Sequence, residues 1–78
     1  MTRNRGGDST DAFVACTVVV RRKLERSVIL AGIDDEDLVC GRSLLSYKSE
    51  EEIDEQFKFP VTLQLEIRKW FAKREGLI

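Results

Sequence analysis

The chain has 78 residues, of which 42% are hydrophobic and 35% are charged, and its formal net charge is −1. These values fit one small globular domain, and they exclude the chain-wide positive field that recruits nucleic acid or an anionic membrane. Histidine is absent, which removes the commonest general base and any Ser-His or Cys-His nucleophile. We therefore expect a protein that is not an enzyme, with no catalytic residues and no cofactor.

The two cysteines, Cys16 and Cys40, lie within the apolar stretches ACTVVV and DLVCG. A structural zinc site needs four ligands, and the chain has no Cys-x-x-Cys pair, so no metal site is predicted. We expect two reduced, buried thiols in a cytoplasmic protein, with the nucleus left open. The apolar run AFVACTVVV is too short to cross a bilayer, and RRKLER follows it where a signal peptide would have its cleavage site.

The first third of the chain allows two interpretations. Residues 1–9 are polar and predict a flexible tail before a single helical domain, 10–78. Between residues 10 and 31 apolar residues recur at steps of three and four, which predicts a helix; they are Phe13, Cys16, Val20, Leu24, Val28 and Ala31. The β-branched run TVVV favours strand instead. A β-hairpin with strands near 12–20 and 27–33 therefore stays open as the alternative.

The middle of the chain carries two helix-start signals. Asp34 suits an N-cap, with Asp37 three residues later in the favourable first turn. In SEEEIDEQF, Ser49 followed by Glu52 forms a capping box. The second signal is the clearer one, and it predicts a helix over about 49–57.

The segment FPVTLQLEIRKWFAKREG, residues 59–76, alternates like a strand at its start and has helical spacing at its end. As a strand, it would place Val61, Leu63, Leu65 and Ile67 on one face. As a helix capped by Thr62, it would align Leu63, Ile67, Trp70 and Phe71 and end at Gly76. The alternation stops at KWF, so helix is favoured, and a strand near 57–68 is the alternative. In the helix, Val61, Leu65 and Ala72 would lie opposite the core stripe, either as ordinary scattered surface residues, which is the favoured interpretation, or as a second apolar stripe for a partner.

Charges occur in blocks that alternate in sign along the chain. The basic blocks are Arg21, Arg22, Lys23 and Arg26, and then Arg68, Lys69, Lys73 and Arg74; the acidic blocks are Asp34, Asp35, Glu36 and Asp37, and then Glu50, Glu51, Glu52, Asp54 and Glu55. Such blocks form solvated faces or complementary surfaces that direct association. Aromatic residues among basic ones are typical of nucleic-acid-binding helices, but the helical spacing assigns Trp70 and Phe71 to the core.

From Val39 to about Phe71 the chain resembles a SAM (sterile alpha motif) domain. The matching positions are Val39, Gly41, Leu44, Leu45 and Tyr47, then Ser49, Glu51, Glu52 and Ile53 after a one-residue slip, and Ile67. The resemblance implies a five-helix bundle whose role is protein–protein association, often through an acidic mid-chain surface that docks on the start of another copy's last helix. Some relatives bind RNA hairpins through basic residues.

The sequence thus predicts an all-α, small five-helix bundle acting as a non-enzymatic protein–protein interaction module, self-associating or binding a protein partner, without membrane contact. Its predicted partner-binding residues are acidic (Glu50, Glu51 and Asp54), apolar (Val61 and Leu65) and basic (Lys69 and Lys73). One alternative is a nucleic-acid-binding domain that uses basic residues of 21–26 and 68–74, namely Arg21, Arg22, Lys23, Arg26, Lys69 and Lys73. Another is a small α+β subunit of a larger assembly, with an N-terminal hairpin and a strand near 57–68.

Overall fold

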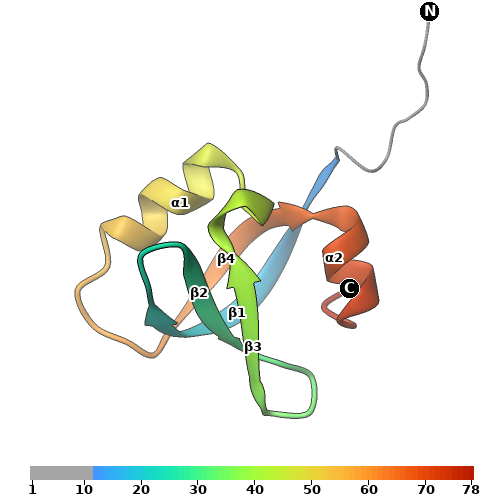
Figure 1. Cartoon of the computed structure of the whole chain (residues 1–78), viewed down its shortest axis with the longest axis horizontal. Coiled ribbons are helices and arrows are strands. Elements are labelled where there is room, and N and C mark those ends of the chain that lie inside the picture. Colours follow the sequence, from blue (N-terminus) through green and yellow to red (C-terminus); the bar gives the residue numbers. More distant parts are fainter. Residues whose placement is uncertain (1–11) are drawn as a thin grey trace, which may run out of the picture.

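A computed structural model describes residues 12–78, and Figure 1 shows a sheet with one helix at either side of the view. The sheet has four antiparallel strands in the order β3-β2-β1-β4: β1 (Phe13–Lys23), β2 (Ser27–Ala31), β3 (Asp37–Gly41) and β4 (Val61–Arg68). A 3-10 turn, η2 (Arg42–Leu44), and helix α1 (Tyr47–Asp54) connect β3 to β4, and helix α2 (Lys69–Arg74) follows β4. The predicted all-α, SAM-like helical bundle is therefore wrong, and the α+β alternative describes the fold. The predicted tail, 1–9, lies outside the described residues.

A hairpin, β1 and β2, stands where the sequence favoured a helix over 10–31. Cys16, Val18 and Val20 alternate with exposed or half-buried neighbours, as the β-branched run requires of a half-buried strand. The register between β1 and β2 shifts between Val20 and Arg22, which marks a β-bulge. The helical spacing was misleading because it combined buried residues, Cys16, Val20 and Val28, with the exposed residues Phe13 and Leu24.

Strand β4 resolves the ambiguous segment. Leu65 pairs with Cys16 and Ile67 pairs with Val14, so the alternating apolar residues of β4 face the core. The predicted helix from Thr62 is wrong, because pairing along β1 outweighs the helix propensity of the Leu-Gln-Leu-Glu stretch. The helical part begins only at Lys69, where the alternation stops. It ends as predicted at Gly76, which has a φ of 73° and is followed by a hydrogen bond from Leu77 N–H to Ala72 C=O.

The predicted middle helix exists, but it begins earlier than expected. Ser46, not Ser49, is the N-cap of α1, and its Oγ accepts a hydrogen bond from Ser49 N–H at 3.2 Å. Asp34 starts no helix. Its carboxylate accepts from Glu36 N–H at 3.2 Å within the β2–β3 turn, so the same side-chain chemistry stabilises a turn instead of a cap.

The two edges of the sheet approach each other at one end. Leu45 bridges Ile67 of β4, although it lies only four residues beyond the end of β3 at the opposite edge. In a flat sheet β3 and β4 would be three strand spacings apart, about 14 Å. A 3-10 turn advances only about 2 Å per residue, so four residues could not cover that distance. The sheet is therefore strongly curled.

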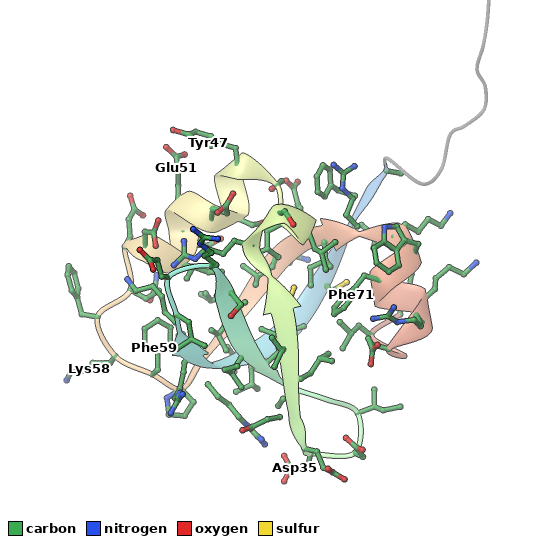
Figure 2. All side chains as sticks on the ribbon, viewed as in Figure 1. Asp35, Tyr47, Glu51, Lys58, Phe59 and Phe71 are labelled. Carbon is green, nitrogen blue, oxygen red and sulfur yellow. The ribbon has the colours of Figure 1, made fainter. Side chains whose placement is uncertain are left out.

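The core fills the inner face of this curled sheet. Ile53 of α1 and Phe71 and Ala72 of α2 join the inward residues of the strands, and Figure 2 shows Phe71 directed from α2 toward the sheet. Both free cysteines belong to this core, which confirms the prediction that their thiols are buried. Burial, and next the neighbouring Cys16, raises the pKa of Cys40 to about 11, so this thiol is neutral at pH 7.

Candidate nucleic-acid interface

Helix α2 has one buried face and one basic face. Phe71 and Ala72 are buried. The opposite side of the helix carries Lys69, Trp70, Lys73 and Arg74. Residues four positions apart lie next to each other on a helix surface, so Lys69 neighbours Lys73 and Trp70 neighbours Arg74. Trp70 is 42% exposed, so its predicted place in the core is wrong. The sequence held the signal, because on a helix that starts at Lys69, Trp70 falls among three basic residues.

Cations lie against the aromatic rings of this region. The Arg74 guanidinium is 5.2 Å from the Trp70 ring centre, and Trp70 meets Phe71 edge-on at 5.9 Å. Phe13, the first residue of β1, is 39% exposed, and its ring lies 4.5 Å from the guanidinium of Arg68, its register partner on β4. Such contacts hold the rings in place while part of each ring surface faces solvent. We name this region the basic–aromatic surface; it consists of Phe13, Arg68, Lys69, Trp70, Lys73 and Arg74.

The positive charge of this surface is only partly neutralised. Arg74 Nε lies 2.9 Å from Glu75 Oε2. For Lys69 and Lys73, no ion pair is formed with any of residues 12–78. Both ammonium groups are therefore available to an anionic partner.

An acidic turn borders the surface. A cleft of about 400 Å³ separates the end of α2 from the β2–β3 turn, with Lys73 and Arg74 on one wall and Asp34, Glu36 and Asp37 on the other. No ion pair within residues 12–78 crosses this cleft. The acidic turn therefore limits how far an anionic ligand extends from α2 in this direction.

The structure does not bring the two predicted basic segments together. Arg68 pairs with the first residue of β1, whereas 21–26 lie at and beyond its far end, roughly 26 Å away at 3.3 Å per residue. Arg21 is engaged by Asp35 at 2.6 Å and by Asp37 at 2.8 Å. Lys23 lies 3.9 Å from Asp54. Only Arg22 and Arg26 in this segment are exposed without an ion pair among residues 12–78.

The predicted protein-binding residues are also dispersed. Arg42 holds Asp54 at 3.0 Å and Glu50 at 3.8 Å, and its hydrogen bond lowers the pKa of Asp54. Glu51 points away from the sheet (Figure 2). Leu65 is fully buried and Val61 packs against the core, so these two do not form an exposed stripe. Of the predicted set, Glu50 and Asp54 lie together on α1 but are engaged by Arg42, whereas Lys69 and Lys73 share the basic–aromatic surface.

Neither helix within residues 12–78 has the length and apolar character needed to cross a membrane. In the same residues, no group of three or more His, Cys, Asp or Glu side chains is placed to hold a metal ion. Comparisons with protein-family models, curated proteins and solved structures returned no match. Function is therefore inferred from the geometry of the basic–aromatic surface.

Proposed function

We propose that the chain is a non-enzymatic domain that binds single-stranded nucleic acid through the basic–aromatic surface. The observation that carries this proposal is the outward arc of α2, where the partly exposed Trp70 ring lies among Lys69, Lys73 and Arg74. Proteins that bind single strands combine cations for the phosphates with aromatic rings on which bases stack. Phe13 supplies a second partly exposed ring beside Arg68.

Single strands fit this surface better than a duplex does. The six residues of α2 span about 9 Å, which is short for a recognition helix in a major groove. In a duplex the bases are stacked on one another, and Trp70 and Phe13 would find no free base face. The near-neutral net charge is compatible with this function, because acidic residues gather on α1 and in the β2–β3 turn.

We further propose that the protein acts inside the cell, in the cytoplasm or nucleus. Its two free cysteines support this location, because thiols stay reduced there. Single-stranded RNA and DNA intermediates occur in both compartments.

Binding is measured with oligo(dT), oligo(U) and a duplex of equal length. Trp70 is the only tryptophan, so quenching of its fluorescence reports stacking in the wild type. The anisotropy of a dye-labelled oligonucleotide measures the affinity of every variant, including Trp70→Ala. Because base–aromatic stacking contributes about 1–3 kcal/mol, Trp70→Ala should weaken single-strand binding by roughly 5- to 150-fold. If the three cations of α2 contact phosphates, the logarithm of the affinity for a single strand should fall with the logarithm of the salt concentration with a slope of about −2. The double variant Lys69→Ala with Lys73→Ala should have a less steep slope.

Lys58→Ala is the matched control, because Lys58 is an exposed lysine in the segment before β4, and Figure 2 shows it on the opposite side of the molecule from Phe71 of α2. It should leave the affinity unchanged. Equal affinity of wild type and Trp70→Ala for oligo(dT) would overturn the proposal. So would binding to vesicles rich in phosphatidylserine without any binding to oligonucleotides at low salt.

A further inference from the structure

The two outer strands of the sheet have edges of different kinds. At the β4 edge, the Glu66 N–H donates to Ser49 Oγ at 2.7 Å and the Glu66 C=O accepts from Ser46 N–H at 3.0 Å, so the start of α1 covers this position. None of residues 12–78 covers the β3 edge in this way. Figure 1 shows β3 at the front of the molecule, with α1 and α2 to either side.

The backbone groups that β3 leaves unpaired follow from its register. Arg42 N–H donates to Arg26 C=O at 3.0 Å, and Gly32 N–H donates to Glu36 C=O at 2.8 Å. Hydrogen-bonded pairs alternate in an antiparallel ladder, so the even positions of β3 bond to β2. Asp37, Val39 and Gly41 therefore direct their N–H and C=O groups away from the sheet. Within residues 12–78 these groups have no backbone partner, and only the Cys40 thiol contacts one of them, the Gly41 C=O at 3.7 Å.

Side chains do not protect this edge. The central residue, Val39, is 61% exposed, although it is β-branched and apolar. Exposed edges in native proteins usually carry charged side chains, above all lysine, or a proline or a bulge that prevents pairing with another chain. The strand β3, DLVCG, has only Asp37, which stands at its first position and is engaged by Arg21 at 2.8 Å. An edge left in this state is suited to accept another strand.

We propose that the β3 edge pairs with the β3 edge of a second copy of this chain, antiparallel and centred on Val39. In this register Val39 meets Val39 of the other copy across a two-fold axis, and Asp37 meets Gly41 twice. All three pairs are of the hydrogen-bonded kind, so the N–H and C=O groups of Asp37, Val39 and Gly41 are satisfied in both copies. The glycine leaves room for the Asp37 side chain, which Arg21 already holds at 2.8 Å.

Charge complementarity favours a second copy as the occupant. The turn before β3 is acidic, and the residues after β3 and beside its end are Arg42 and Arg26. Antiparallel pairing centred on Val39 places Glu36 of one copy opposite Arg42 of the other. Arg26 is the ladder neighbour of Arg42, is exposed, and forms no ion pair within residues 12–78. The Arg42 side chain is already engaged by Asp54 and Glu50, so each end of the interface brings the acidic turn of one copy toward Arg26 of the other, twice by symmetry.

Sedimentation velocity over a concentration series, up to on the order of 100 µM, tests the proposal. The wild type should pass from monomer to dimer. Val39→Lys should weaken dimerisation by at least about tenfold, because like charges then meet at the two-fold axis. Val39→Thr, which keeps the β-branched shape, is the matched control and should retain the dimer. Circular dichroism establishes that each variant is folded.

A charge-swapped pair tests the register without touching Val39. Glu36→Arg and Arg26→Glu, both at exposed positions, should each weaken the homodimer. Mixing the two variants should restore a dimer. At one end of the mixed dimer the new Arg at position 36 meets the new Glu at position 26, and at the other end the native Glu36 and Arg26 meet. A wild type that stays monomeric, a Val39→Lys variant that dimerises like the wild type, or a mixture without restored dimer would each overturn the proposal. The inference is independent of nucleic-acid binding.

Discussion

Ser49 and Glu66 connect the first turn of α1 to β4: the Glu66 N–H donates to Ser49 Oγ at 2.7 Å. Ser49 is 2% exposed, and it is the buried polar residue among the described ones. Ser46 adds two further contacts to the same residue, from its N–H to the Glu66 C=O at 3.0 Å and from its Oγ to Glu66 Oε1 at 2.8 Å. Two serines therefore fix where the helix lies against the sheet.

Ser49→Ala should lower the free energy of unfolding by about 1–3 kcal/mol, because the Glu66 N–H loses its acceptor in this part-buried contact. Urea unfolding followed by circular dichroism measures this loss. Ser43→Ala is the control, since Ser43 is an exposed serine in η2, and it should change stability by less than about 0.5 kcal/mol. Equal midpoints for the two variants would contradict the Ser49–Glu66 contact.

Leu65→Ala should cost about 2–5 kcal/mol, the range for a leucine removed from a packed core. Leu65 is fully buried, whereas Leu24, in the β1–β2 turn, is 38% exposed. Leu24→Ala therefore serves as the control, with an expected loss below about 1 kcal/mol. The difference in urea midpoint decides whether Leu65 faces the interior or, as in the helical interpretation, a partner.

Acid should remove the stabilising contribution of the Arg42–Asp54 ion pair. The Arg42 hydrogen bond lowers the pKa of Asp54 in the folded protein, below the value of about 3.9 expected when the chain is unfolded. The pair therefore stabilises the fold above that value, and its contribution disappears as the pH falls through the folded pKa. Asp54→Asn should be less stable than the wild type near neutral pH, by under about 1 kcal/mol because the pair is partly exposed.

The difference between wild type and Asp54→Asn should shrink as the pH falls below about 3.9, as measured by urea midpoints across the pH range. Glu51→Gln is the control, because Glu51 forms no ion pair with residues 12–78. A pH-independent difference for Asp54→Asn would show that another group is responsible.

Neither native thiol should react readily with Ellman's reagent at neutral pH. Burial raises the pKa of both Cys16 and Cys40, and only the thiolate attacks the reagent. Both should react at once in concentrated urea. Ser43→Cys supplies the positive control, since it places one thiol at an exposed position, and that thiol alone should react in the folded protein.

The sequence predicted the existence of α1 and the helix end at Gly76, but contacts between distant residues decided the rest. The alternation of apolar residues in 61–67 indicated a strand. That strand forms by pairing with β1, and the sequence of 61–67 alone does not reveal its partner. Ser46 and Ser49 both suit an N-cap, and Ser46 takes this role while Ser49 binds Glu66, 17 residues away. For the candidate site, the basic block of α2 was visible, whereas the outward direction of Trp70 depended on where the helix begins.

The pairing of β1 with β4 has a consequence for how the chain folds. The register partners are separated by 41 residues at Val20–Val61 and by 55 residues at Phe13–Arg68. The entropy of closing the long intervening loop is lost before these contacts form, and topologies rich in such distant pairs fold slowly for their size. The β1–β2–β3 meander is local and can form early, but Phe13 to Val20, most of β1, then lacks its partner strand until β4 is made. Synthesis of the chain therefore exposes the apolar residues of β1 until β4 arrives.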